Sequence, residues 1–311
     1  MSKLKVRRRR SALALALVAV AASSCNCEVE RHSLEFGGKQ RSYLLHLPDP
    51  VPTGPAPFVL SLHGRLGTGN GMRNSTGYND RADAAGVVVA YPDGIDRSWA
   101  DGRGVSPAAQ QGIDDVGFLL ALIDAIDQQI ALDRERLYVM GISNGGFMTQ
   151  TLACREGSRL AGVASIVSTI PAALAENCAP DRPLSALFMN GTADPLVPFE
   201  GGTVDSDVGG EIISSDAAAA HWVDHDRCDP TPEEISFDSK DDGTSIRYQR
   251  YRTCDSDTAV DYYVVEGGGH TWPGGEQYLP EGQIGVASEE IDGLGAVWDF
   301  LLAQKRAPPR G

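Results

Sequence analysis

Short apolar runs alternate with amphipathic stretches along most of the chain. The runs at 58–62, 87–90 and 137–140 are continuously apolar, which is typical of strands covered on both faces of a parallel sheet. A helical period is clearest over Ile113–Leu132, where apolar side chains face away from Asp124 and Asp127. The pattern predicts strands at 41–47, 58–63, 87–91, 137–140, 163–168, 186–190 and 262–266, and helices at 113–132, 146–155, 214–225 and 289–304.

This alternation of strands and helices predicts an α/β fold, with a doubly wound, mostly parallel sheet and helices on both faces. We find neither an internal repeat nor a linker, so residues 39–305 are interpreted as one catalytic domain that follows a tether at 25–38. Two stretches rich in Gly, Asp, Ser and Pro, Glu200–Glu211 and Asp226–Thr244, are interpreted as surface loops. Only 17 residues separate the strands at 163–168 and 186–190, so we expect a minimal cap.

The N-terminus has the pattern of an export signal. Met1–Arg10 is basic, and the apolar run at 11–22 is shorter than the roughly 20 residues that span a membrane. Ala22-Ser23-Ser24-Cys25 resembles a lipoprotein signal, which predicts a signal peptide at 1–24 and lipidation of Cys25. Cleavage by an ordinary signal peptidase and export by a twin-arginine route are the alternatives. We therefore expect an extracellular or periplasmic protein that is anchored to a membrane as a lipoprotein.

The charge excludes some classes of partner. The formal net charge is −15, and six positive charges lie in the first ten residues with no acid before Glu28, so the chain from residue 25 carries −21 (−15 minus 6). Nucleic acids and anionic membranes bind basic surfaces. We therefore expect no nucleic-acid partner and no membrane contact other than through the lipid anchor. The oligomeric state stays open.

Six cysteines are present, and export would place them in an oxidising compartment. If Cys25 is lipidated and Cys27 lies in the tether, four cysteines remain and allow three pairings. We favour the local pairs Cys154–Cys178 and Cys228–Cys254, each of which closes a loop of about 25 residues. Each disulfide would stabilise the folded chain by roughly 3 kcal/mol. Since no CxxC motif occurs, neither zinc binding nor redox catalysis is indicated.

A nucleophile motif follows the apolar strand at 137–140. Gly141-Ile142-Ser143-Asn144-Gly145 matches GxSxG, with a strand running into it and a helical pattern leaving it. In this context the serine occupies a strained turn, and the two glycines leave room for the turn. Ser143 is therefore the candidate nucleophile.

A serine nucleophile needs a base, and the base needs a carboxylate that orients it. Three histidines follow Ser143, and His270 lies in a glycine-rich loop after the strand at 262–266, which makes it the candidate base. His221 and His225 are spaced i and i+4, as metal ligands can be, but no third ligand is evident and we interpret them as a helix-surface pair. No metal or other cofactor is expected.

The candidate acid is Asp194, which follows the strand at 186–190 and precedes His270, the order found in α/β hydrolases. Its rivals, Asp205, Asp207 and Asp216, lie in acidic stretches and are interpreted as solvated charges.

An oxyanion hole requires two backbone amides near the nucleophile. One is expected from Asn144, directly after Ser143. The other is expected from the glycine-rich loop after the strand at 58–62, where we favour Arg65, with Leu66 next. His63, in the same loop, is interpreted as a structural hydrogen-bonding residue.

Several segments together resemble one family, the secreted polyhydroxybutyrate depolymerases and feruloyl esterases, which include LpqC-like lipoprotein esterases. They span residues 40 to 300 and are LHG at 62–64, AYPDG at 90–94, SWADGRG at 98–104, RLYVMGISNGGFMT at 136–149, NGTADPLVPF at 190–199 and GGGHTWPGG at 267–275. The resemblance implies an α/β-hydrolase fold and the triad Ser143, Asp194 and His270. At Arg65-Leu66 the family often has a small residue or Cys and then a polar residue, so the shape of the acyl pocket is not implied.

The motifs and the resemblance together predict a secreted serine esterase that hydrolyses feruloyl, aryl or 3-hydroxybutyrate polymer-type esters through an acyl-enzyme. Trp99 and Trp272 are candidate substrate contacts, because an indole can stack on a phenolic or sugar ring. A carbohydrate acetyl esterase and a serine exopeptidase are the alternatives with the same triad. A non-catalytic surface binding module is the alternative from another class.

Overall fold

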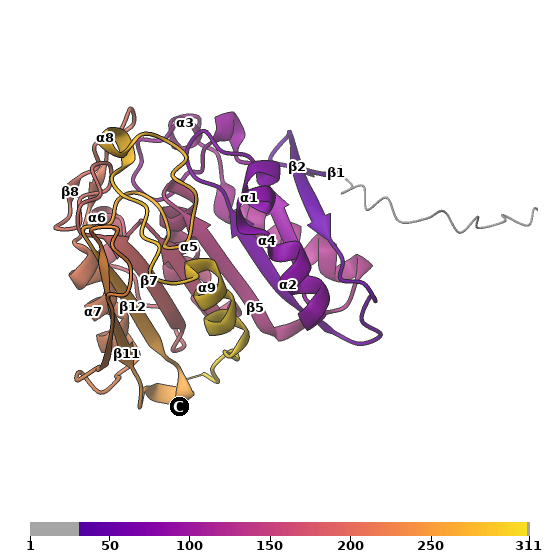
Figure 1. The fold of residues 1–311 in the computed structure, drawn as a ribbon. Helices are drawn as coiled ribbons and strands as arrows, with labels where there is room; N and C mark the ends of the chain where they lie inside the picture. The colour runs from indigo at the N-terminus through magenta and orange to yellow at the C-terminus, as the bar shows by residue number, and fades with distance from the viewer. Residues whose placement is uncertain (1–30, 310–311) are drawn as a thin grey trace, which may run out of the picture.

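A ten-stranded sheet runs through the molecule (Figure 1), whose computed structural model describes residues 31–309. The predicted signal peptide and Cys25 lie outside the described residues. The sheet order is β1-β2-β4-β3-β5-β6-β7-β12-β11-β10, parallel from β4 to β12 and antiparallel at both edges. These strands are β1 (Arg31–Phe36), β2 (Lys39–His46), β3 (Ala56–Leu62), β4 (Val88–Pro92), β5 (Leu132–Ile142), β6 (Gly162–Ile166), β7 (Ser185–Gly191), β10 (Glu233–Phe237), β11 (Ser245–Tyr251) and β12 (Val260–Glu266); β8 (Gly202–Thr203) and β9 (Glu211–Ile212) pair separately.

Helices cover both faces of this sheet. The α-helices are α1 (Gly69–Thr76), α2 (Tyr78–Ala85), α3 (Pro107–Gln110), α4 (Asp115–Gln129), α5 (Asn144–Glu156), α6 (Ala172–Ala175), α7 (Ser215–His225), α8 (Glu281–Ile284) and α9 (Gly293–Leu302). Side chains of α4, α5 and α7 share one apolar cluster, and those of α1, α2 and α9 share another. Within β3, Phe58 and Leu60 belong to the first cluster and Val59 to the second. The continuous apolar runs therefore form strands that are buried on both faces, as predicted.

The fold confirms the predicted doubly wound α/β class with a minimal cap. Between β6 and β7 lies a single short helix, α6, so nothing larger covers the carboxyl edge of the sheet at that point.

Two boundaries in the sequence interpretation were wrong. Residues 31–36, assigned to the tether, form β1, which pairs antiparallel with β2 from Arg31 opposite Leu44 to Phe36 opposite Lys39. The stretch Asp226–Thr244, interpreted as a loop, contains β10, and β11 follows it. β10 lies at the sheet edge, where the adjacent exposed side chains of Glu233 and Glu234 hide the alternation that marks a strand.

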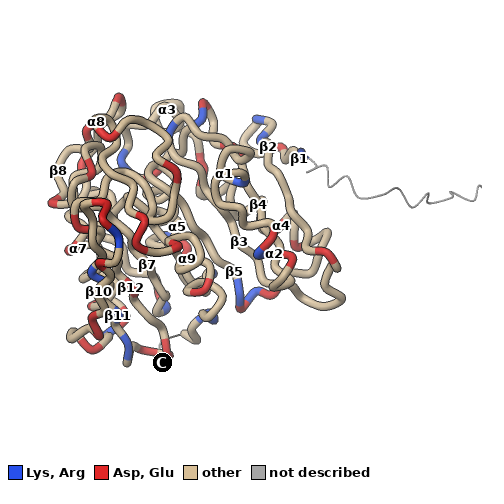
Figure 2. Tube along the Cα trace, viewed as in Figure 1, with Lys and Arg blue, Asp and Glu red and all other residues tan. Residues whose placement is uncertain are grey.

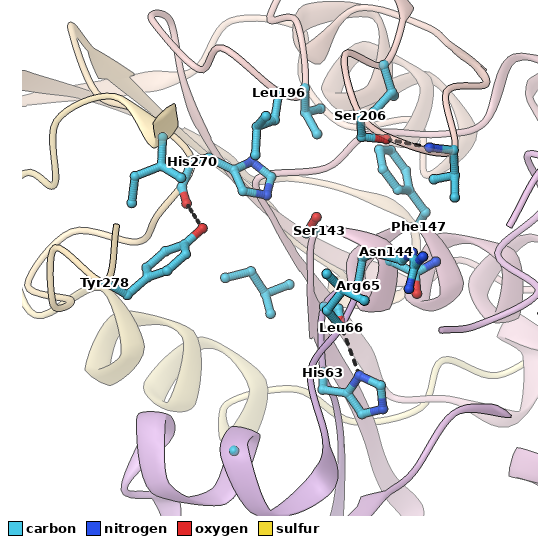
Figure 3. A pocket seen from close by; sticks show the side chains of 18 of the residues that line it. His63, Arg65, Leu66, Ser143, Asn144, Phe147, Leu196, Ser206, His270 and Tyr278 are labelled. Atoms are coloured by element: carbon cyan, nitrogen blue, oxygen red, sulfur yellow. Dashed lines mark hydrogen bonds between the residues drawn. The ribbon is translucent and has the colours of Figure 1, made fainter. Parts of the chain in front are cut away.

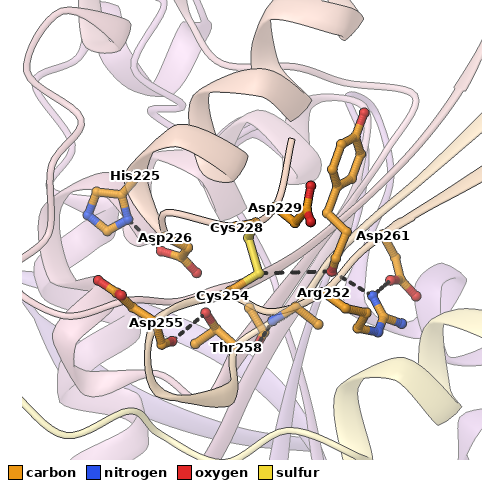
Figure 4. The surroundings of a disulfide bond; sticks show 12 residues. His225, Asp226, Cys228, Asp229, Arg252, Cys254, Asp255, Thr258 and Asp261 are labelled. Atoms are coloured by element: carbon orange, nitrogen blue, oxygen red, sulfur yellow. Dashed lines mark hydrogen bonds and ion pairs between the residues drawn. A yellow bond between two sulfur atoms is a disulfide. The ribbon is translucent and has the colours of Figure 1, made fainter. Parts of the chain in front are cut away.

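Both expected disulfides are present, Cys154–Cys178 and Cys228–Cys254, with sequence separations of 24 and 26. The first joins the C-terminal end of α5 to the segment after α6. The second joins the segment after α7 to the segment after β11, beside buried Asp226 (Figure 4). Each bond therefore fixes a helix that packs on the sheet.

Acidic and basic residues are interspersed along the described chain (Figure 2). In residues 31–309, no helix combines the length and the apolarity that crossing a membrane requires.

Candidate active site

Ser143 occupies a sharp turn between β5 and α5. Its backbone lies at φ 54° and ψ −121°, a strained conformation for a residue with a side chain. A Cβ at Gly145 would collide with the carbonyl oxygens of Leu62 and His63, and one at Gly141 would collide with the backbone of Gly145. The two glycines of the motif are therefore required by close backbone contacts, and they bring the turn against the end of β3.

His270 and Asp194 are joined by a hydrogen bond. Nδ1 of His270 lies 2.7 Å from Oδ2 of Asp194, and both side chains are almost fully buried. The other carboxylate oxygen accepts hydrogen bonds from the amides of Leu196 and Val197, at 2.8 and 2.9 Å. Because Asp194 accepts on both oxygens, the proton belongs on Nδ1, which leaves Nε2 of His270 as a proton acceptor.

The imidazole of His270 points toward the hydroxyl of Ser143 in a shared pocket (Figure 3). Among the described residues, no hydrogen bond joins the two side chains. In ligand-free hydrolases this contact is often long and shortens when substrate binds. The structure thus brings the three predicted triad residues together at the carboxyl edge of the sheet.

The backbone amides of Asn144 and Arg65 have no hydrogen-bond acceptor in the described part of the chain, and both residues line the pocket with Ser143. The amide of Leu66, the second candidate, donates to the carbonyl of Arg97 at 2.9 Å, so Leu66 was wrong as an alternative donor. Gly67 donates to Gly64, which closes a turn with Leu66 in the left-handed region at φ 62°.

The buried side chains of His63 and Trp99 stabilise this turn through hydrogen bonds. Nε2 of buried His63 accepts from the amide of Gly94 at 3.0 Å, so Nδ1 donates to the carbonyl of Gly64, which agrees with the structural role predicted. Burial lowers the pKa of His63 and keeps the ring neutral. Trp99 is completely buried, and its indole donates to the carbonyl of His63. Trp99 as a substrate contact was therefore wrong, because its ring does not reach the pocket.

The pocket around Ser143 has a volume of about 430 Å³ and a largely apolar lining that includes Trp272. Other apolar lining residues are Leu66, Phe147, Leu196, Val208, Tyr278 and Leu279. The charged lining residues each have a partner: Arg65 pairs with Asp207, and Arg103 pairs with Asp101. Trp272 as a substrate contact stays a prediction.

Two of the residues that line this pocket, Phe147 and Tyr278, were missed in the sequence. Phe147 could have been found, because it lies four residues after Ser143 on the helix that the motif begins. Tyr278 could not, since no pattern marks its position. The hydroxyl of Tyr278 donates to the carbonyl of His270 at 3.0 Å, and partial burial together with the charge of Asp194 raises its pKa to about 12.

His221 and His225 lie on α7, away from the pocket. Both nitrogens of His225 are engaged, with Asp226 at 2.7 Å and with the carbonyl of Pro180 at 2.9 Å. Within residues 31–309, no group of three or more His, Cys, Asp or Glu side chains has an arrangement that could hold a metal ion.

The sequence model of the family described as "Esterase PHB depolymerase" matches residues 41–177. The curated protein "Putative esterase NocK" of Nocardia uniformis is 32% identical over 276 residues, which cover 85% of this chain and 80% of that protein. The chain belongs to the PHB depolymerase esterase family. Another relative, feruloyl esterase C of Emericella nidulans, is 25% identical over 271 residues, covering 85% of this chain and 84% of that one. As a member of this family, the protein is a carboxylic ester hydrolase.

Solved structures agree with this family in their fold. A thermostable esterase superposes with a TM-score of 0.59 at 16% identity, over 89% of this chain and 63% of that one. An acetyl xylan esterase from Aspergillus awamori superposes with a TM-score of 0.57 at 13% identity, over 88% and 98%. The PHB depolymerase esterase therefore has the α/β-hydrolase fold expected from its sequence.

Proposed function

We propose that Ser143, His270 and Asp194 are the catalytic triad of this esterase and that the amides of Asn144 and Arg65 form its oxyanion hole. The observation that carries the proposal is the buried hydrogen bond from His270 to Asp194, beside a serine in the strained turn of an α/β hydrolase. The unpaired amides of Asn144 and Arg65 support the second half of the proposal.

In this mechanism Nε2 of His270 takes the proton of the Ser143 hydroxyl while the oxygen attacks the ester carbonyl carbon. The carbonyl oxygen becomes an oxyanion, which accepts hydrogen bonds from the two amides. His270 then gives its proton to the leaving alcohol as the C–O bond breaks, and an acyl-enzyme remains. Water attacks the acyl-enzyme with His270 again as the base, which releases the acid and restores Ser143.

The proposed substrates are uncharged esters with an aromatic or apolar acyl group, with feruloyl and other aryl esters first and 3-hydroxybutyrate polymers second. The lining supports this choice, because it is mostly apolar and every charge in it is paired. Among the described residues, three of the five exposed large apolar side chains, Leu66, Tyr278 and Leu279, lie in this pocket. Apolar groups on a substrate would cover them.

The test is the rate of hydrolysis of p-nitrophenyl acetate, p-nitrophenyl butyrate and methyl ferulate by the exported protein and by its Ser143→Ala variant. We expect the variant to fold and to lose activity by about 10⁴-fold or more. Hydrolysis of amide probes in preference to these esters would support an exopeptidase instead. A rate that greatly favours acetate would support an acetyl esterase, and a wild type that hydrolyses none of the probes would support a binding module.

We also propose that the chain from β1 to residue 305 acts as one catalytic domain and that Cys25 carries the lipid of a membrane-anchored lipoprotein. The two disulfides and the family agree with an exported protein. Mass spectrometry of the mature N-terminus tests the anchor: a diacylglyceryl group on Cys25 is expected, and an unmodified N-terminus would contradict it.

A further inference from the structure

The loop Val204–Gly210, here called the 204–210 loop, contacts three separate segments of the proposed active site. The carboxylate of Asp207 pairs with the guanidinium of Arg65 at 2.7 Å. The carbonyl of Gly209 accepts from Arg103 at 2.8 Å, and the amide of Asp205 donates to the carbonyl of Leu196 at 2.8 Å. Ser206 also stabilises the loop internally, because its hydroxyl accepts from the amides of Val208 and Gly209.

The contact with Arg65 constrains the first proposed oxyanion donor. Arg65 lies at the second position of the turn Gly64–Gly67, and a Cβ at Gly64 would lie 3.5 Å from Cβ of Ser143, so the turn lies against the serine. The amide of Leu66 is held on one side by Arg97. On the other side Asp207 holds the guanidinium, which fixes the direction of the Arg65 side chain and restricts rotation of its backbone.

A second chain of contacts leads from the loop to Asn144. The side-chain amide of Asn144 accepts from the amide of Trp99 and donates to the carboxylate of Asp101. Asp101 forms two hydrogen bonds with the guanidinium of Arg103, and both side chains are 2% exposed or less. The same guanidinium reaches Gly209 and also lies over the Phe147 ring, with its central carbon 4.4 Å from the centroid.

The geometry points to a function for the 204–210 loop: it positions both oxyanion-hole amides, with Asp207 and Arg103 as positioning residues. This inference rests on the proposed triad and oxyanion hole. Each oxyanion donor typically contributes a factor of about 10² to 10³ to kcat, and a misplacement of about 1 Å can cost up to 10²-fold. The carboxylate of Asp207 is 59% exposed, so its ion pair with Arg65 contributes little energy and its removal changes kcat by a modest factor.

A simpler interpretation is that the loop is only a wall of the pocket. The two interpretations differ in how they affect different substrates. A displaced oxyanion donor slows every ester by the same factor, because every substrate develops the same negative charge on its carbonyl oxygen. A displaced wall instead raises KM, and raises it more as the acyl group becomes larger.

The experiment compares Asp207→Asn, Arg65→Gln and the double variant with the wild-type exported protein on p-nitrophenyl acetate, p-nitrophenyl butyrate and methyl ferulate. We expect each single variant to lower kcat by about 2- to 5-fold on all three esters, the most that loss of an exposed ion pair can cause, with KM nearly unchanged. The double variant should lose no more than either single variant, because both remove the same contact. An unchanged kcat, or a loss confined to methyl ferulate, would overturn the proposal.

The chain offers a matched control in Glu233, which is 60% exposed and pairs with Arg250 at 3.1 Å on β10 and β11. Glu233→Gln also removes one carboxylate charge, and it should leave kcat and KM at their wild-type values. If Glu233→Gln reproduced the loss seen with Asp207→Asn, the effect would be one of net charge and the proposal would be wrong.

Two further measurements separate positioning from folding and from the proposed function. Affinity for phenylboronic acid, which forms a tetrahedral adduct with a catalytic serine, should fall in Asp207→Asn by the same factor as kcat/KM. Arg103→Lys keeps the buried charge and should lower kcat on all three esters, with circular dichroism confirming the fold. If Ser143→Ala abolishes activity while Asp207→Asn and Arg103→Lys match the wild type, the present inference fails and the proposed function stands.

Discussion

The turn at Ser143 and the 204–210 loop both line the pocket, yet they are held in different ways. The turn is fixed by buried backbone contacts and by glycines that allow no side chain. The loop is held toward Arg65 by a carboxylate that is 59% exposed. The proposed nucleophile is therefore held by contacts that solvent does not reach. The proposed placement of the Arg65 amide depends instead on an exposed contact that a single substitution removes.

Energetic considerations support the same distinction. Asp194 accepts three hydrogen bonds in a buried environment, and a charged group loses several kcal/mol if left there without partners. The exposed ion pair of Arg65 and Asp207 is worth about 0 to 1 kcal/mol. Substitutions of Asp194 should therefore lower kcat by orders of magnitude, whereas substitutions of Arg65 or Asp207 should lower kcat by modest factors.

The largest expected effect comes from Asp194→Asn. An amide would accept from the backbone amides of Leu196 and Val197 but would favour the wrong tautomer of His270, so kcat should fall by about 10⁴-fold. Steady-state kinetics with p-nitrophenyl butyrate measures this loss, and an unfolding curve checks the fold. A loss below about tenfold would mean that Asp194 does not orient the base.

A smaller effect is expected at the rim of the pocket from Leu66→Gly. Leu66 is 54% exposed at φ 62°, a conformation that glycine adopts without strain, so the turn should keep its shape. Losing an apolar contact worth about 1.5 kcal/mol should raise KM for methyl ferulate by roughly tenfold. KM for p-nitrophenyl acetate should rise less.

Val51→Gly is the control for this change, because Val51 is 52% exposed and does not line the pocket. Equal effects of Leu66→Gly on the acetate and the ferulate ester would show that Leu66 acts on the turn and not on the acyl group.

The smallest effect concerns His63 and pH. Its pKa in the folded protein is lowered by burial, so below about pH 6.5 the unfolded chain binds a proton that the folded chain does not. The stability that neutral His63 contributes should therefore be fully present above this pH. The free energy of unfolding should decrease as the pH falls toward the lowered pKa, by at most about 1.4 kcal/mol per pH unit.

Urea unfolding between pH 5 and 8 measures this dependence, with His63→Gln as the comparison. Glutamine carries one donor and one acceptor and does not titrate, so its curve should be flatter than that of the wild type. Parallel curves would contradict the predicted role of His63 in the stability of the turn.

The sequence was most informative where the relevant residues are neighbours. The turn at Ser143 could be predicted because its glycines, the strand before it and the helix after it are contiguous. The order of the chain also sufficed for Asp194 and His270, since parallel strands end at the same edge of the sheet.

The failures involve residues that the fold brings together from a distance. Arg65 and Asp207 are separated by 142 residues, so nothing local marks Asp207 as different from other solvated acids. Trp99 lies 45 residues before Asn144, and only the folded chain shows its indole turned toward the carbonyl of His63. β10 was missed because an edge strand exposes charged side chains on both of its faces.

The hydrogen bonds of Asn144 determine which residues of the site can be substituted. Its side chain is fully engaged with Trp99 and Asp101, so a substitution there removes the support of its own backbone amide. Arg65 contributes only its amide to the proposed oxyanion hole, and its side chain, 21% exposed, lines the pocket and pairs with Asp207. Of these two positions, 65 is the one where a substitution retains the backbone donor, at the modest cost in kcat that loss of the contact with Asp207 brings.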